Sequence, residues 1–189
     1  MKIIILSISI IFIIEACDIF DTREPESPSN TKSSFKTPVV PEDVIENLIN
    51  SFSDKNANDY KKNFSSGLPL VNRDFYFAPS GNVLTSFPES WDVDSEFQYF
   101  NNLITRISED LPITLSLTQG QLDVMADSAI YTADYFLSVP DLTTGSRIFE
   151  GSLKFTLVTD INAAWVICYW EDNAKAESTT WSELKIEFY

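Results

Sequence analysis

The stretches SAIYTADYFLSV, residues 128–139, and RIFEGSLKFTLV, residues 147–158, decide the fold class of this chain. In both stretches apolar and polar side chains alternate, and successive side chains of a strand point to opposite faces of its sheet. The apolar side consists of Tyr131, Ala133, Tyr135, Leu137, Val139, Phe149, Leu153, Phe155 and Leu157. We therefore expect two long strands with one face in the core and one face in water.

Three further stretches, residues 113–125, 163–172 and 180–188, complete the expected sheet. The middle stretch is apolar on both sides, which is typical of a central strand whose sheet is covered twice. Its two sides carry Trp165, Ile167 and Tyr169, and Val166, Cys168 and Trp170. The second of these sides predicts an apolar outer patch. A second copy of the chain, giving a homodimer, or a folded-over segment such as the end with Trp181 would cover it.

The part of the chain before Pro112 is expected to be mainly helical. Pro41 followed by two carboxylates favours a helix start, because proline presets the helical backbone angle and the carboxylates face the positive end of the helix dipole. Asp92 or Ser95 can cap a later helix. The expected elements are helices over 41–52, 59–64 and 95–107, and a short strand over 75–77. Together these elements predict an α+β fold, with N-terminal helices packed on a strongly curved antiparallel β-sheet.

The N-terminus carries the features of an export signal. A charged start precedes an apolar run over residues 3–14, and Ala16 stands before Cys17. This run is shorter than the roughly 20 residues that a membrane-spanning helix needs. Residues 14–17, IEAC, resemble the bacterial lipobox, so Cys17 is the expected lipidation site. The protein is then expected in the bacterial cell envelope, anchored to the inner or the outer membrane. The alternatives are an uncleaved anchor and a buried N-terminal strand.

The segment that follows Cys17 is rich in Pro and Ser and has no apolar period. Such a composition is typical of a flexible linker. We therefore expect a signal peptide over 1–16, a lipidated Cys and tether over 17–38, and a single domain over 39–189.

The order of these elements resembles that of a known family. The residues that carry the resemblance are ANDY at 57–60, DSA at 127–129, GSLKFTL at 151–157 and WVI at 165–167. They resemble the nuclear transport factor 2-like cone, including its SnoaL-like branch, and the resemblance covers residues 41–189. It implies a pocket between the concave face of the sheet and the helices.

Enzymes of that family place acids, Tyr or His in this pocket, so the resemblance implies an aromatic cavity with hydroxyl groups here. The candidate pocket residues are Tyr60, Trp91, Tyr99, Tyr131, Tyr135, Tyr169 and Glu171. Glu171 is the candidate acid because it shares the alternation of Trp165 and Ile167. Aromatic residues at such spacing more often form plain core.

Composition excludes several functions. Thirteen Lys and Arg against 28 Asp and Glu give a net charge of −15, so nucleic acid is not an expected partner. The chain has no His, which removes imidazole chemistry. It carries no phosphate-binding loop, dinucleotide fingerprint or metal-ligand spacing, so no cofactor and no metal are expected.

Two classes of function remain. The first is a membrane-tethered, non-catalytic module that binds a small apolar ligand or a protein partner. The second is a small pocket enzyme of the isomerase, dehydratase or hydrolase type, which would use acid and base chemistry without His. The first is preferred because only the family resemblance supports the second. A carboxylate and a Tyr hydroxyl in one closed pocket would favour the enzyme, and a filled interior would favour the binding module.

Overall fold

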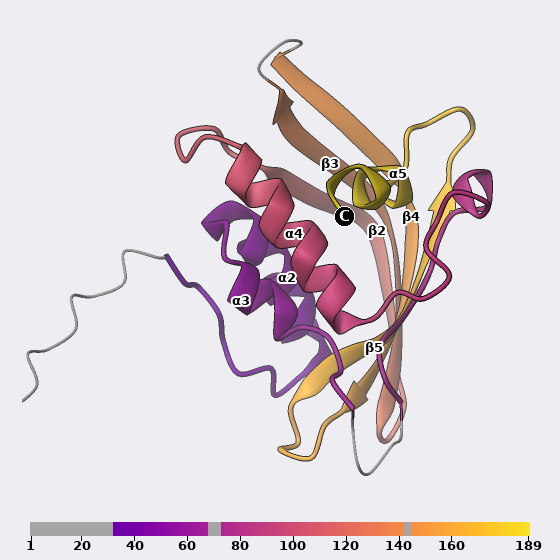
Figure 1. Cartoon of the computed structure of the whole chain (residues 1–189). Helices are drawn as coiled ribbons and strands as arrows, with labels where there is room; N and C mark the ends of the chain where they lie inside the picture. Colours follow the sequence, from indigo (N-terminus) through magenta and orange to yellow (C-terminus); the bar gives the residue numbers. More distant parts are fainter. Residues whose placement is uncertain (1–31, 68–72, 142–144) are drawn as a thin grey trace, which may run out of the picture. The chain divides into compact units, whose positions relative to one another are not determined.

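The structure, a computed structural model, describes residues 32–67, 73–141 and 145–189 (Figure 1). The signal peptide, Cys17 and the first part of the expected tether lie outside the described residues. No helix in the described ranges is long and apolar enough to cross a membrane.

One five-stranded sheet with the order β1-β5-β4-β3-β2 forms a layer of this fold. Its strands are β1 (Tyr76–Ala78), β2 (Thr114–Val124), β3 (Ser128–Asp141), β4 (Gly145–Thr159) and β5 (Trp165–Ala174). All neighbours are antiparallel except β1 and β5, so the sheet is mixed where an entirely antiparallel one was expected. The alternation predicted for β3 and β4 is confirmed, because the core face carries Ala133, Leu137, Phe149 and Leu153 as buried residues.

Helices form the second layer, as Figure 1 shows for the three that precede β2. The helices are α2 (Pro41–Asp54), α3 (Ala57–Lys61), α4 (Val93–Arg106) and α5 (Trp181–Phe188), with a 3₁₀ turn, η2, at Gly81–Val83. Pro41 begins α2, and the side chain of Asp92 caps α4 by accepting a hydrogen bond from Ser95 N at 2.8 Å. The start at Pro41 and a cap at Asp92 were among the expectations, whereas α3 and α4 each begin two residues before the expected residues 59 and 95. The α+β fold class is therefore confirmed.

The C-terminal segment is a helix and not the expected fifth long strand. Trp181, Leu184 and Phe188 are buried, and their spacing of three and four residues suits one helix face. Glu183 accepts a hydrogen bond from the backbone N–H of Thr180 at 2.5 Å, which satisfies a free donor at the helix start. The capping pair was visible in the sequence, and it outweighs the strand-like composition.

A β-bulge in β5 changes which side chains face the core. Leu157 pairs with Ile167 and Thr156 pairs with Tyr169, so Cys168 is an extra residue on its strand. Beyond the bulge the alternation is shifted by one position. Trp170 consequently lies in the core, and its ring contacts that of Trp181 at 4.6 Å. The predicted outer patch that included Trp170 is wrong; Val158, Val166 and Cys168 form a smaller outer cluster instead, and self-association stays a prediction.

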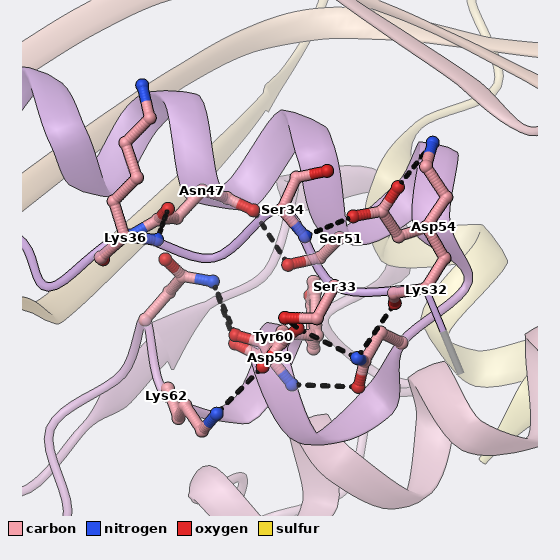
Figure 2. Close-up of polar contacts among 12 residues, drawn as sticks. Lys32, Ser33, Ser34, Lys36, Asn47, Ser51, Asp54, Asp59, Tyr60 and Lys62 are labelled. Atoms are coloured by element: carbon pink, nitrogen blue, oxygen red, sulfur yellow. Dashed lines mark hydrogen bonds and ion pairs between the residues drawn. The ribbon is translucent and has the colours of Figure 1, made fainter. Parts of the chain in front are cut away.

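Residues 32–38, here called the strap, were expected in the tether and are bonded to side chains of α2 (Figure 2). Ser34 N donates to Asp54 Oδ2 at 2.7 Å. The side-chain amide of Asn47 bonds both the N–H and the C=O of Lys36, at 2.9 and 2.7 Å. The strap is held by polar groups of α2 and not by apolar side chains of its own. Its sequence therefore has no apolar period, and for this reason it was expected in the tether.

Candidate functional site

The predicted pocket residues are divided between the two faces of the sheet. Tyr60, Trp91, Tyr99 and Tyr135 are buried in the core, and Tyr131 is half-buried on the same side. Tyr169 and Glu171 follow the bulge and lie on the outer face. There Glu171 stands opposite Lys154 in the register of β4 and β5. The structure thus brings together the first group only.

The C-terminal helix α5 fills the space between the sheet and α4. Trp181 is fully buried, and its indole Nε1 donates to Tyr99 Oη at 2.9 Å. Its ring packs at 5.5 Å from Phe52 and 5.3 Å from Tyr135. The cone interior that the resemblance implied as a pocket is therefore occupied by side chains of the chain itself.

A buried ion pair lies in this interior. The ammonium of Lys185 contacts the carboxylate of Glu96, and neither residue has exposed surface. Tyr60 Oη donates to the second oxygen of that carboxylate at 3.0 Å. Lys185 Nζ also lies 3.6 Å from the ring centroids of Phe77 and Trp170, close enough for a cation–π contact with each. Loss of hydration lowers the pKa of Lys185 and raises that of Tyr60 well beyond their ordinary values.

Neither Glu96 nor Lys185 was among the residues predicted for the site. On α4, Glu96 and Tyr99 are buried, whereas the apolar Phe97 is only half-buried. Lys185 was placed on a strand. The sequence signal was the spacing of Glu96, Tyr99 and Leu103 at three and four residues, which is a helix face with one charge in it.

A second buried carboxylate, Asp172, was also missed because the bulge reverses its direction. Asp172 accepts hydrogen bonds from Tyr135 Oη at 2.7 Å and from Ser182 N and Oγ at 2.8 and 2.5 Å. Burial raises the pKa of Asp172, and the bonds from Ser182 and Tyr135 oppose this rise without cancelling it. Burial likewise raises the pKa of Tyr135. A carboxyl group beside a Tyr hydroxyl is the pairing that an isomerase-type site needs, but both carboxylate oxygens here bond the protein's own donors.

An open hollow lies beside the strap, with a volume of about 650 Å³, within the range of ligand pockets. We call it the strap hollow. Its lining comes from the strap, α3, the start of α4 and the turn between β4 and β5. The apolar residues that line it are Phe35, Pro38, Phe64, Val93, Ala164 and Val166. The strap hollow was not predicted, because one of its walls was expected in the tether and another is a turn.

The charged groups on the rim of the strap hollow are largely paired. Lys62 Nζ lies 2.7 Å from Asp59 and 4.8 Å from the ring of Phe35. Lys61 Nζ lies 2.7 Å from Asp94. The carboxylate of Asp160 accepts backbone N–H bonds within its own turn. An apolar floor with a paired rim suits an uncharged apolar ligand.

Among the described residues, no group of three or more Cys, Asp or Glu side chains could hold a metal ion. No family model matches the chain, and no match is found among curated proteins.

Solved structures do match, at low sequence identity. A nuclear transport factor 2-like superfamily protein from Salmonella enterica is 13% identical, with a TM-score of 0.52 over 71% of this chain and 87% of that chain. A candidate dehydratase of the nuclear transport factor 2-like family from Streptomyces avermitilis is 9% identical, with a TM-score of 0.56 over 70% and 91%. A candidate aromatic ring hydroxylase from Novosphingobium aromaticivorans is 14% identical, with a TM-score of 0.58 over 76% and 92%. These likenesses show the fold: helices on a curved sheet in the nuclear transport factor 2-like cone.

Proposed function

We propose that this protein is a lipid-anchored module of the bacterial cell envelope that binds a small apolar ligand without turning it over. One observation carries the binding part: the cone interior is filled by α5, while the strap hollow is open and floored by apolar side chains. The anchor rests on the sequence of residues 1–17, with Cys17 as the lipidated residue.

The filled interior supports binding over catalysis. Glu96 and Asp172 are the two fully buried carboxylates beside Tyr hydroxyls in the described part of the chain, and an acid–base enzyme would use such pairs. Glu96 is engaged by Lys185 and Tyr60, and Asp172 by Tyr135 and Ser182. A substrate would have to displace α5 before it reached either carboxylate, which the strap hollow does not require.

The ligand part is tested by filling the strap hollow. Ala164→Trp adds a large side chain to its wall, and Asn82→Trp makes the same addition at an exposed position of η2. We expect the intact chain to bind the uncharged apolar dye Nile red, and Ala164→Trp to weaken that binding at least about tenfold. Asn82→Trp should bind as the wild type does. Equal binding by all three proteins contradicts the assignment of the hollow.

The anchor is tested separately. Metabolic labelling with a fatty-acid probe should mark the wild type and leave Cys17→Ser unmarked. Cell fractionation should find the wild type with membranes, since two or more acyl chains hold a protein on a bilayer stably. Equal labelling of the wild type and Cys17→Ser would contradict the proposed anchor. It would not bear on the ligand proposed for the strap hollow.

A further inference from the structure

The outer face of the sheet, opposite the helices, carries a polar band that crosses four strands. The residues of the band lie in two rows. Within each row, every residue is the register partner of its neighbour on the adjacent strand. The first row is Gln121, Thr132, Lys154 and Glu171, and the second is Thr118, Asp134, Ser152 and Asn173. Most of these side chains line a shallow hollow of about 330 Å³, together with Gln119. We call it the sheet-face hollow.

Hydrogen-bonding capacity is left unused in this hollow. Within the described ranges, the side chains of Gln119, Gln121, Thr132, Ser152 and Lys154 make no hydrogen bond or ion pair with another residue. Amide and hydroxyl groups both donate and accept. Such a set matches a ligand whose own groups do both, which is the property of a sugar hydroxyl.

The charges of the band cancel. Asp134 forms an ion pair with Lys175, and Glu171 stands opposite Lys154 in the register. Two carboxylates and two ammonium groups therefore balance within the two rows, while Asp123 and Glu150 lie beside the rows on the same face. An uncharged ligand meets neither attraction nor repulsion from the band as a whole.

Exposed aromatic rings flank the band on both sides. Phe136 lies two residues beyond Asp134 on the same face of β3 and is 44% exposed. On the other side, Tyr169 lies two residues before Glu171, and its ring stacks with Tyr76 at 5.9 Å; Tyr76 is 57% exposed. These two tyrosines form part of the lining of a second hollow of about 450 Å³. Ring faces of this kind offer flat apolar surface beside hydrogen-bonding groups.

We propose that the outer face of the sheet binds a neutral oligosaccharide. The chain of sugars lies across β2 to β5, which span about 14 Å at the usual strand spacing. The two polar rows bond its hydroxyls, and sugar rings pack on Phe136 and on the Tyr76–Tyr169 pair. This site is separate from the strap hollow, and it does not depend on the function proposed for that hollow. The competing occupant of the same face is a second copy of the chain.

The test titrates the full-length protein with cellohexaose, laminarihexaose, maltohexaose and N-acetylchitohexaose by calorimetry. At least one of these neutral hexasaccharides should bind, and Phe136→Ser and Gln121→Leu should each weaken it about tenfold. Leu84→Ser, which removes an apolar side chain that is 60% exposed but lies outside the sheet, is the matched control and should bind as the wild type does.

Two results would overturn the proposal. The first is that no hexasaccharide binds at about 10 mM, or that Phe136→Ser binds as well as Leu84→Ser. The second is a wild type that sediments as a dimer and becomes a monomer with Phe136→Ser, which would assign the face to a second copy of the chain. An unchanged far-UV circular dichroism spectrum and urea midpoint of Phe136→Ser show that the variant is folded.

Discussion

The helix α5 and the N-terminal strap are both joined to the fold through charged side chains, but in opposite surroundings. Lys185 of α5 and its partner Glu96 have no exposed surface. Lys32 of the strap pairs with Asp54 at 2.8 Å, and its own side chain is 69% exposed. Water reaches the strap pair through Lys32, although the side chain of Asp54 is only 2% exposed, and it does not reach the α5 pair. Two ion pairs with similar chemistry should therefore differ greatly in what their loss costs.

Burial of the Lys185–Glu96 pair also bears on two separate properties: the stability of the fold and the position that α5 takes in it. Bringing Lys185 and Glu96 out of water is expensive, and their attraction offsets this cost only because Tyr60, Phe77 and Trp170 complete the surroundings. We expect an apolar pair of the same size to hold α5 about as firmly. We infer that the ion pair instead fixes the position of α5, since any shift of the helix separates the charges.

Lys185→Ala should have the largest effect of the changes considered. It leaves the carboxylate of Glu96 buried without its cation, which typically costs about 3–5 kcal/mol in the free energy of unfolding. Urea denaturation followed by tryptophan fluorescence measures the loss. Lys175→Ala, which breaks the half-exposed pair with Asp134, is the matched control and should cost less than about 1 kcal/mol.

The double variant that combines Lys185→Met with Glu96→Leu sharpens the same comparison. It removes both charges and keeps the volume, so the loss should fall well below that of Lys185→Ala. A double variant as unstable as Lys185→Ala would mean that the pair contributes net stability.

The next largest effect is expected for Asp172→Asn, which should lower the free energy of unfolding by about 1–3 kcal/mol at pH 4. An amide has a single acceptor oxygen, so it cannot accept the hydrogen bonds of both Tyr135 and Ser182. The pKa of Asp172 is raised above its ordinary 3.8. As the pH rises from 3.8 through the raised pKa, the folded state binds more protons than the unfolded state, so wild-type stability falls. The amide of the variant does not titrate. The stability difference between the two proteins should therefore narrow with rising pH, and a difference that widens would show that the carboxylate is stabilised in the fold.

The sequence was sufficient where a period was long and uninterrupted. β3 and β4 alternate over more than ten residues, and α2 begins at a proline followed by carboxylates, so these elements were predicted close to their observed bounds. The order of helices before strands then led to the correct fold class.

The candidate site was less predictable from the sequence, because its residues lie where the regular alternation or helical spacing of apolar residues is interrupted. One inserted residue, Cys168, moves Trp170 and Asp172 inward and Glu171 outward. A buried Glu96 contradicts the rule that charges face water, and only its distant partner Lys185 explains it. The strap is held by side chains of α2, and such contacts leave no pattern in the strap itself.

Removing the strap should have an intermediate effect. A chain that begins at residue 39 loses the bonds of Ser34 to Asp54 and of Lys36 to Asn47, each worth about 1 kcal/mol net. Ordering the strap costs part of this, so we expect a loss of about 2 kcal/mol in thermal or urea unfolding. A chain that begins at residue 32 is the control and should match the full chain. If the two shortened chains are equally stable, the strap rests on the fold without stabilising it.

The smallest effect is expected for Lys61→Ala. Lys61 pairs with Asp94 at 2.7 Å, yet their side chains are 39% and 77% exposed, so water screens the pair and both side chains lose rotamer freedom by forming it. The loss should stay below about 0.5 kcal/mol and should vanish at high salt. Lys62→Ala is the informative partner variant, because its Asp59 side chain is only 6% exposed and also accepts a bond from Ser33. Lys62→Ala should therefore cost more than Lys61→Ala, and an equal cost would mean that burial of one partner alone does not decide what a pair contributes.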